Sequence, residues 1–494
     1  MDRISRSDWF WLGAILALAT ALRVRGLNGP LWYDELQTVV THLRLSWGDM
    51  LQSYSMNHHY LHNIAAKVSM EAFGESSWAI RLPAMVFGLA SLAAMWALAR
   101  EVAGSAIAHV TTLLLALSYH EIWFSQNARG YTGLALFSTL GMLLFLRGIA
   151  RPTVAIWLGY GLCLAAAVFT HLTGAFFFAA QGLVWLALVA THALRGRLDG
   201  ALLRLPFLGF LAGGLLATLL YLPILPSLLV TVSTVSETSA VDVMKEYQNP
   251  IWTAFEAIRT GIGHAGPFTA LVGAAVLILS ALGAVALHHD APLFAPITLL
   301  HIILTTALLM AVGMRIWPRF FFVDIGFLML LIVMGVRLSC DLVGHLIKNE
   351  RAGRGLFALA VVAMAAISLL LAKRNYEIPK QDLAGAFEIV EEIARPGERV
   401  FAVGHAGAVY RDYFHAGWPI IYTEDDYRAA TAEPGPLILV VGFPGRNFRE
   451  VPGLGHDAGP DPCDEKRAAG HLLTAVACLP GTLGDGDVIV LRRD

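Results

Sequence analysis

The stretch FTALVGAAVLILSALGAVAL, residues Phe268–Leu287, contains twenty consecutive residues without a charged side chain. A run of this length and composition is typical of an α-helix that crosses the hydrocarbon core of a bilayer, which is about 30 Å thick. Apolar runs of roughly 15–22 residues recur along the first three quarters of the chain. The pattern predicts a polytopic membrane protein that is mainly α-helical.

Eleven runs of this kind are predicted to form transmembrane helices, and the shorter ones are expected to extend into flanking amphipathic residues. The predicted spans are Trp9–Leu22, Pro83–Leu98, Ala103–Tyr119, Gly133–Leu146, Thr153–Phe169, Gly174–Ala190, Leu205–Leu222, Phe268–Leu287, Pro292–Val312, Phe320–Val336 and Leu356–Ala372. The composition agrees, since 15% of the residues are charged, whereas a soluble domain has about 25%. The formal net charge of -2 shows no basic excess, so no nucleic-acid partner is expected.

Basic residues predict the orientation of these helices, because they concentrate in cytoplasmic loops. The loops of one side carry Arg3, Arg6, Arg100, Arg147, Arg151, Arg195, Arg197, Arg204, Arg337, Lys348, Arg351 and Arg354. The N-terminus is therefore expected in the cytoplasm, and an odd number of spans places the C-terminal tail outside. Two of the outward loops are long, at about residues 23–81 and 223–267, and loops of that length usually carry function.

The tail differs in composition from the rest of the chain and predicts a small soluble α/β domain. The periodicity of Lys380–Ala394 predicts a helix, and several short apolar runs predict strands. The predicted strands are Arg399–Val403, Pro419–Tyr422, Leu437–Val441 and Val488–Leu491. Cys463 and Cys478 both lie in this tail, where an oxidising exterior would allow a disulfide. We therefore predict a transmembrane catalytic domain over residues 1–372 and an extracytoplasmic domain over residues 373–494.

The first long outward loop contains an acidic motif, Trp32-Tyr33-Asp34-Glu35, followed by the amphipathic stretch Leu36–Leu45. The motif on its own is explained by a helix start, because the helix dipole stabilises negative charge near an N-terminus. The functional alternative is a carboxylate held at the membrane surface as a general base. Such a base would take the proton from an acceptor hydroxyl or amine as it attacks a sugar carbon.

The same loop contains the histidine-rich segment NHHYLH, Asn57–His62. His58 and His62 are four residues apart, so a helix would place both on one face, where they could bind a divalent metal. No nearby carboxylate completes a metal site, and the imidazoles are equally explained as hydrogen-bonding groups at the membrane interface. No cofactor is certain from these residues, and a divalent metal stays an open alternative.

Three further polar segments are predicted on the same outward side of the bilayer. They are HEIWFSQNARGY (His120–Tyr131), THLTG (Thr170–Gly174) and MRIWPRF (Met314–Phe320). Polar groups beside apolar spans are costly unless they face protein or water. Their principal cationic or titratable members are Arg129, His171, Arg315 and Arg319. Each arginine alone is explained as an interface anchor, but together they would bind a phosphate and stabilise it as it leaves.

These segments, in this order, resemble the glycosyltransferase-C superfamily, in particular its branch of protein O-mannosyltransferases and bacterial aminoarabinose transferases. WYDE is similar to the acidic motif of that family's first periplasmic loop, and ESSWAIRLPA (Glu75–Ala84) to the end of the loop. WFSQNARGY (Trp123–Tyr131), THLTG and PRFFFVDIGFLMLL (Pro318–Leu331) resemble later segments of the family. The stretch Ile378–Val400 is similar to the start of the soluble domain of its bacterial members.

The resemblance implies a transmembrane helix bundle of about eleven helices with amphipathic helices on its outer face. It also implies a donor sugar on a polyprenyl phosphate, which is transferred with inversion. At the matching positions, Asp34 would be the base and Glu35 its partner, although either acid is a candidate. Arg129 and Arg319 would bind the lipid phosphate, with His171 near the donor.

The chain departs from the family pattern in the segment Asn57–Leu61, where the family usually has a histidine followed by two prolines. That segment lines the acceptor side in the family, so the acceptor stays open between a lipid, a glycan and a protein. The residues expected to line the substrates are Tyr33, His58, His59 and Tyr131, and those expected at the donor phosphate are Arg129, Arg315, Arg319 and His171.

We therefore expect a multi-pass glycosyltransferase of the bacterial inner membrane that acts at the outer face. The alternative is a transporter or flippase that uses the same charged groups as a substrate path without transferring a sugar. Transporter cores often have broken helices near the middle of the bilayer. The polar clusters of this chain lie at the ends of the predicted spans, which favours an interfacial enzyme.

Overall fold

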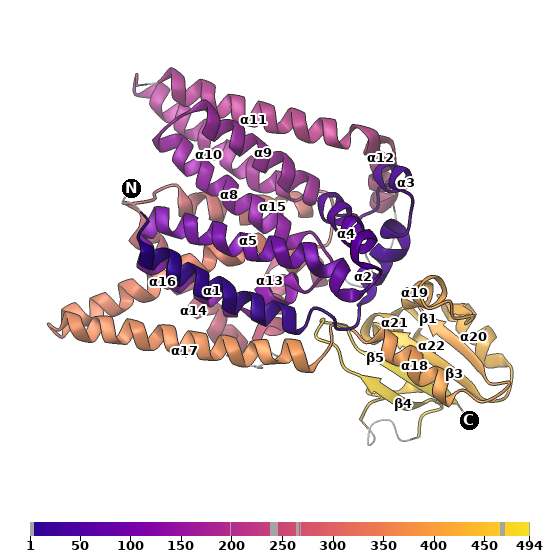
Figure 1. Ribbon diagram of the computed structural model, residues 1–494. Helices are drawn as coiled ribbons and strands as arrows, with labels where there is room; N and C mark the ends of the chain where they lie inside the picture. The colour runs from indigo at the N-terminus through magenta and orange to yellow at the C-terminus, as the bar shows by residue number, and fades with distance from the viewer. Residues whose placement is uncertain are drawn as a thin grey trace. The chain divides into compact units, whose positions relative to one another are not determined.

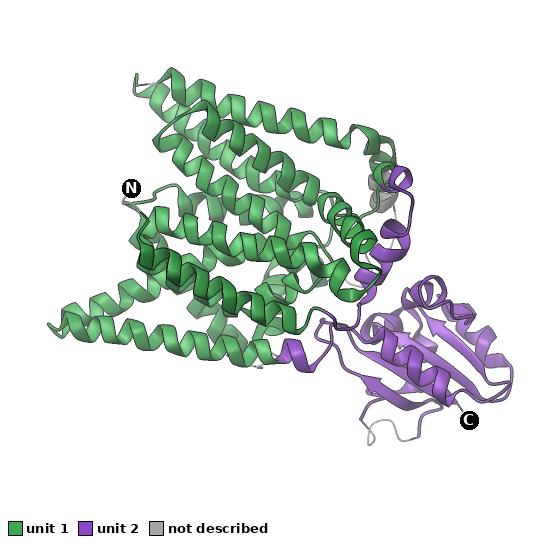
Figure 2. Cartoon of the chain, in the orientation of Figure 1, with its two compact units in different colours: residues 1–27, 51–237, 246–373 green, residues 28–50, 238–245, 374–494 purple. Residues whose placement is uncertain are grey.

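The structure of this chain is a computed structural model that describes residues 4–197, 199–237, 246–262, 266, 268–464 and 470–493. It divides into two compact units, which Figure 2 shows in green and purple. The described parts of the first unit lie within residues 1–27, 51–237 and 246–373, and those of the second within residues 28–50 and 374–494.

The first unit is a bundle of apolar helices (Figure 1). Nine helices of the described chain are long and apolar enough to cross a membrane. They include α1 (Arg6–Arg25), α5 (Ser77–Ala103), α8 (Tyr131–Ala150), α10 (Gly174–Leu194), α11 (Gly200–Tyr221), α14 (Phe268–Leu287), α15 (Phe294–Ala311), α16 (Phe322–Leu346) and α17 (Glu350–Glu377). The predicted class, a polytopic helix bundle with a small α/β part, is confirmed.

The two remaining predicted spans correspond to shorter apolar helices. They are α6 (Ser105–Leu117), with 13 residues, and α9 (Val154–Thr170), with 17 residues. At a rise of about 1.5 Å per residue, helices of these lengths cover only part of a 30 Å hydrocarbon core. The exact number of spans therefore stays a prediction.

Shorter elements connect the long helices of the first unit. These are α4 (Tyr60–Phe73), α7 (Tyr119–Ser125), the 3-10 turn η2 (Leu222–Ile224), α12 (Leu225–Glu237), α13 (Pro250–Ile262) and the 3-10 turn η4 (Pro318–Phe321). α4 packs against α5 and α9, and η4 leads directly into α16. The candidate site is built from these connections.

Close packing of α14 on α16 fixes the helix that follows η4. A Cβ atom added to Gly283 of α14 would overlap the backbone carbonyl of Leu331, and one added to Gly335 of α16 would overlap that of Leu279. Small residues let membrane helices approach to backbone contact where the lipid offers no hydrophobic driving force between them. The two glycines thereby hold α16, and with it the segment that carries Arg319.

The second unit contains a five-stranded sheet with the order β2-β1-β3-β5-β4. Its strands are β1 (Arg399–Val403), β2 (Ile420–Ile421), β3 (Leu437–Gly442), β4 (Thr474–Leu479) and β5 (Val488–Arg493). β1 pairs in parallel with β2 and β3, while β5 is antiparallel to β3 and β4. Four of these strands lie where the sequence predicts them, whereas the edge strand β4 was not predicted.

Short helices complete the second unit. They are α18 (Leu383–Ile393), α19 (Ala406–Asp412), α20 (Glu424–Ala432), α21 (Pro444–Glu450) and α22 (Pro452–Ala458). The first outward loop contributes α2 (Tyr33–Thr38), the π-helical turn η1 (Val39–Leu43) and most of α3 (Trp47–Gln52). α18 confirms the helix expected within Lys380–Ala394, with the side chain of Asp382 capping its first turn through the N–H of Gly385 at 2.9 Å.

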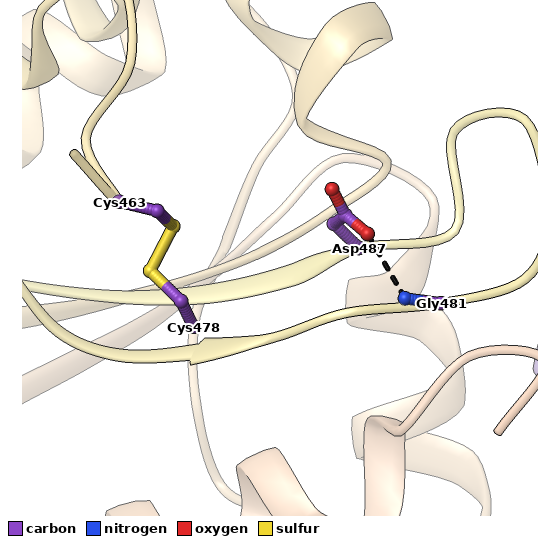
Figure 3. Close-up of a disulfide and its surroundings, with 4 residues drawn as sticks. All are labelled: Cys463, Cys478, Gly481 and Asp487. Carbon is purple, nitrogen blue, oxygen red and sulfur yellow. Dashed lines mark hydrogen bonds between the residues drawn. A yellow bond between two sulfur atoms is a disulfide. The ribbon is translucent and has the colours of Figure 1, made fainter. Parts of the chain in front are cut away.

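A disulfide joins Cys463 to Cys478 of β4, as Figure 3 shows. In the same view the N–H of Gly481 donates to Asp487 Oδ1 at 2.9 Å and closes the turn between β4 and β5. Structural disulfides persist in oxidising compartments and are rare where thiols are kept reduced. The bond therefore agrees with a tail that faces away from the cytoplasm.

Replacing both bonded cysteines with serine is expected to destabilise the C-terminal unit by about 3 kcal/mol. The two cysteines are separated by 15 positions in the sequence, and closing a loop of this length removes conformational entropy from the unfolded chain. Limited proteolysis in increasing urea measures this change. Replacement of Cys340, which is a free cysteine in α16, is the matched control and should leave the urea midpoint of the C-terminal unit unchanged. An unchanged midpoint in the double serine variant would contradict the prediction.

Candidate functional site

The acidic motif starts a helix in the second unit, and its two carboxylates have different surroundings. Glu35 is fully buried, and its Oε2 accepts the backbone N–H of Trp32 at 3.2 Å, which caps the start of α2. Asp34 is partly exposed on the same turn. The structural explanation of the motif as a helix start therefore applies to Glu35, which leaves Asp34 as the more accessible acid.

Arg129 forms the centre of a buried cluster in the first unit. Its side chain lies in the turn between α7 and α8 and is 3% exposed. Its guanidinium Nη1 donates to the backbone carbonyl of Asn57 at 3.0 Å and also to the side-chain oxygen of Asn57. A buried, always charged guanidinium provides a fixed electrostatic site for an anion.

Two histidine rings lie 4.7 Å apart beside this arginine. The backbone N–H of Gly130 donates to His59 Nδ1 at 3.1 Å, and that of Thr173 donates to His171 Nδ1 at 3.2 Å. Because each Nδ1 accepts a hydrogen bond, each neutral ring carries its proton on Nε2. The Nε2 of His59 is buried without a hydrogen-bond partner in the described chain. The cluster therefore presents a buried donor that the fold itself does not use.

Aromatic rings enclose the two histidines. The ring of Tyr131 lies 5.1 Å from that of His59 and 5.5 Å from that of His171, while Phe320 of η4 lies 5.8 Å from His171. Arg129 lies 5.9 Å from the centre of the Tyr131 ring. The three polar segments that the sequence analysis placed on one side thus converge here, because they contribute Tyr131, His171 and Phe320.

Burial and positive charge keep both histidines neutral. Burial lowers the pKa of His59 well below its usual value, and the charge of Arg129 lowers it further. Burial, Arg129 and Arg319 together lower the pKa of His171 from 6.5 to about 3. Near neutral pH the cluster therefore combines permanent arginine charges with uncharged N–H donors, which suits a phosphate group.

The depressed histidine pKa values predict a loss of stability in acid. Below pH 6.5 the unfolded chain binds protons at these two positions that the folded chain does not bind, so unfolding becomes more favourable as the pH falls. The apparent melting temperature of the detergent-solubilised protein should fall between about pH 6.5 and 4.5. The fall should be smaller in His171→Asn. The control is His456→Gln, which replaces an exposed histidine. An equal fall in the parent protein, His171→Asn and His456→Gln would contradict the attribution of the acid sensitivity to His171.

Arg315 and Arg319 both lie near the ring of Trp317. The guanidinium of Arg319 lies 5.0 Å from the centre of that ring, and the guanidinium of Arg315 lies 6.0 Å from it. Trp317 in turn packs on Tyr247 at 4.2 Å, and the N–H of Ile316 donates to the Tyr247 carbonyl at 2.7 Å. The next residue, Phe320, has its ring centre 5.8 Å from that of His171, and the charge of Arg319 lowers the pKa of His171. A similar role for Arg315 stays a prediction.

The helical arrangement expected for His58 and His62 is wrong. α4 begins at Tyr60, so His58 precedes the helix and stacks on the Tyr60 ring at 3.7 Å. The side chain of Asn63 lies between the two histidines, with its Nδ2 3.1 Å from His58 Nδ1 and its Oδ1 3.3 Å from His62 Nδ1. In the described parts of the chain, no three His, Cys, Asp or Glu side chains are grouped so that they could hold a metal ion.

A second buried network, which the sequence analysis missed, supports the turn that carries Arg129. Arg23 is fully buried, and it donates to Ser125 Oγ at 3.0 Å and to the Ala116 carbonyl at 3.2 Å. The Ser125 hydroxyl donates to the Glu121 carbonyl at 2.6 Å. Burial raises the pKa of the Glu121 side chain to about 7, although Arg23 opposes the shift. These bonds hold α7 in place. The signal in the sequence was a pair of charged residues, Arg23 and Glu121, next to predicted spans.

Comparisons with known proteins extend these observations. Residues 57–233 match the family described as dolichyl-phosphate-mannose-protein mannosyltransferase. No curated protein sequence matches the chain significantly. The crystal structure of ArnT from Cupriavidus metallidurans in the apo state is similar with a TM-score of 0.52 and 15% identity, over 98% of this chain and 98% of that chain.

A second solved structure is the archaeal oligosaccharyltransferase AglB from Archaeoglobus fulgidus, in complex with an inhibitory peptide and a dolichol-phosphate. Its TM-score is 0.54 at 12% identity, over 92% of this chain and 73% of that chain. At these identities the likeness shows the fold. The predicted resemblance is confirmed: the fold of this chain is similar to those of ArnT and AglB, and its residues 57–233 match the family described as dolichyl-phosphate-mannose-protein mannosyltransferase.

Proposed function

We propose that this protein transfers a sugar from a polyprenyl-phosphate donor to an acceptor at the outer face of the bacterial inner membrane, with inversion at the anomeric carbon. The observation that carries the proposal is the buried cluster of Arg129, His59 and His171, with Arg319 nearby. A phosphate diester needs charge and N–H donors while it is bound, and it needs them more as it becomes a phosphate monoester dianion on leaving.

In this proposal the arginines hold the donor phosphate and the neutral histidines donate Nε2–H bonds to its oxygens. The His59 Nε2, which has no hydrogen-bond partner in the described chain, supports this role. A buried donor without a partner is costly, and a bound oxygen would remove that cost. The complex of AglB with a dolichol-phosphate provides a precedent for this class of lipid on the same fold.

The isoprenoid tail of the donor is assigned to an apolar groove on the first unit. The groove has a volume of about 260 Å³ and is lined by Val168, Ala217, Thr218, Tyr221, Leu222 and Leu225. The hydroxyl of Tyr221 donates to the Val168 carbonyl at 3.0 Å, so its ring presents an apolar surface there. Val168 lies in the last turn of α9, and His171 follows directly after that helix. The C-terminal end of α9 thus connects the groove proposed for the isoprenoid chain with the cluster proposed for the phosphate.

Asp34 is the base of the proposed reaction. As the acceptor oxygen or nitrogen attacks the anomeric carbon, Asp34 takes its proton, the bond from carbon to phosphate oxygen breaks, and the phosphate leaves on the lipid. Attack from the face opposite the phosphate inverts the carbon. The partial exposure of Asp34, against the complete burial of Glu35, supports this choice between the two acids.

The topology belongs to the proposal as well. We infer a cytoplasmic N-terminus and an extracytoplasmic C-terminal unit, which the basic loops and the disulfide between Cys463 and Cys478 support. A membrane-impermeant protease applied to spheroplasts should remove a C-terminal tag and spare an N-terminal one.

The test of function uses the purified protein in liposomes with a panel of radiolabelled polyprenyl-phosphate sugars. Release of free polyprenyl phosphate together with a labelled acceptor from membrane extract is the expected result. Movement of the labelled lipid across the bilayer without cleavage of its sugar would overturn the proposal in favour of a flippase.

A further inference from the structure

The acidic loop and the C-terminal domain are one compact unit, although more than 300 residues separate them in the sequence. Figure 2 colours residues 28–50 and 374–494 alike for this reason. A loop that only connected two membrane helices would not need contacts with the tail. The contacts between them therefore point to a role for the tail at the acidic motif.

Two contacts hold Tyr33, the residue directly before Asp34. The Tyr33 ring meets the ring of Phe443 edge to face, with the ring centres 5.2 Å apart at 86°. The backbone N–H of Tyr33 donates to the side-chain carbonyl of Gln381 at 3.3 Å. The first N–H groups of a helix have no partner within the helix, so Gln381 acts as a cap on α2 from outside.

The two residues that make these contacts are themselves tightly fixed. Gln381 is fully buried, and the backbone of its segment is anchored by the N–H of Thr482, which donates to the Pro379 carbonyl at 2.9 Å. The Nε2 of Gln381 is buried without a hydrogen-bond partner in the described residues. Burying an amide N–H group without a partner costs free energy, and packing alone does not explain that cost. This supports a role for the hydrogen bond that the Gln381 side-chain carbonyl accepts from Tyr33.

Phe443 has a left-handed backbone conformation, with φ of 54°. Bulky residues rarely adopt this conformation, and such strain persists only where the surrounding structure enforces it. Here Phe443 directly follows β3, and its carbonyl accepts the N–H of Asn447 at 2.9 Å. The strained turn at the end of a fully buried strand is what presents the Phe443 ring to Tyr33.

A third contact lies beyond the other end of α2. The guanidinium of Arg44 lies 4.8 Å from the centre of the Tyr413 ring, just after α19. Contacts at the start of α2 and beyond its end restrict its rotation as well as its position. The carboxylate of Asp34 is carried by this helix, so its direction depends on the tail.

We propose that the C-terminal α/β domain positions the catalytic carboxylate: Gln381 and Phe443 fix Tyr33, and through it they set the direction of Asp34. The inference rests on the proposed function, in which Asp34 is the base. Gln381 and Phe443 are positioning residues and touch no substrate in this scheme. Misplacement of a reacting group by about 1 Å can cost about 100-fold in rate.

The test compares Gln381→Met, which keeps the size of the side chain and removes its acceptor, with Phe443→Ala and the exposed control Leu472→Ala. Both positioning variants should lower kcat by about 10- to 100-fold while KM for the polyprenyl-phosphate sugar stays unchanged. Phe443→Tyr, which restores the ring, should recover most of the rate. Leu472→Ala should match the parent protein.

A double-mutant cycle separates positioning from general loss of structure. If Phe443 acts through Tyr33, then Tyr33→Ala and Phe443→Ala combined should lower kcat no more than either alone. Independent, multiplying effects would overturn the inference, as would a raised KM with unchanged kcat. Wild-type kcat in Gln381→Met and Phe443→Ala, alongside an inactive Asp34→Asn, would reject the positioning role and keep the proposed function. An active Asp34→Asn would reject the proposed function itself.

Discussion

Replacing Asp34 with Asn is expected to lower kcat by about 10²- to 10⁴-fold, which is the usual contribution of a general base. Asn has nearly the same size and shape as Asp, but its amide takes no proton from an attacking nucleophile. KM for the donor should change little, because the residues proposed to bind the phosphate are others. Steady-state kinetics with a lipid-linked sugar, at matched amounts of folded protein, measures both constants.

Two matched variants make this result specific. Asp49→Asn removes an exposed carboxylate from α3 of the same unit and should keep the full rate. Glu35→Gln retains a carbonyl oxygen that can accept the N–H of Trp32, so the start of α2 should survive together with most of the activity. If Glu35→Gln abolished transfer and Asp34→Asn did not, the roles of the two acids would be exchanged.

The sequence was sufficient to predict the membrane-spanning architecture, because length and apolar composition alone decide whether a helix can cross a bilayer. The number of spans was harder to predict. α6 and α9 are apolar but have only 13 and 17 residues, so their length alone does not decide whether they cross. In the tail, β3 was found because its residues are continuously apolar and buried on both faces.

The edge strand β4 was missed for a physical reason. Its sequence, TAVACL, contains two alanines, which have low β propensity, and only alternate side chains are even partly buried. Its pairing with β5 includes a register irregularity between Ala475 and Ala477. Pairing with β5 and the disulfide at Cys478 therefore define this strand better than local propensity does.

The candidate site could be predicted in its chemistry but not in its contacts. Arg129, His171 and Arg319 were identified because ionisable side chains beside apolar spans are costly to bury unless they face protein or water. The bond from Gly130 to His59 joins residues 71 apart, and the bond from Arg129 to Asn57 joins residues 72 apart. Helical spacing carries no information about such pairs, and the start of α4 at Tyr60 made the spacing argument for His58 and His62 fail.

Replacing Arg129 with Ala is expected to raise KM for the donor by about 10²-fold and to lower kcat as well. Removing one member of a buried hydrogen-bonded charge site typically costs about 2–5 kcal/mol. The effect on kcat follows because the same guanidinium would stabilise the phosphate as negative charge develops on it. The KM and kcat of Arg129→Lys should lie between those of the parent protein and those of Arg129→Ala. Lysine keeps the charge but cannot reproduce the planar guanidinium that contacts Asn57.

Direct binding of polyprenyl phosphate without a sugar separates recognition of the donor from chemistry. Arg129→Ala should lose most of this affinity, whereas Arg151→Ala, which removes an exposed arginine just beyond the opposite end of α8, should keep it. Asp34→Asn should also bind normally, because it changes only the proposed base. Undiminished affinity in Arg129→Ala would move the donor phosphate away from the histidine cluster. The charge of Arg129 would then serve the fold, through its bonds to Asn57, and not the reaction.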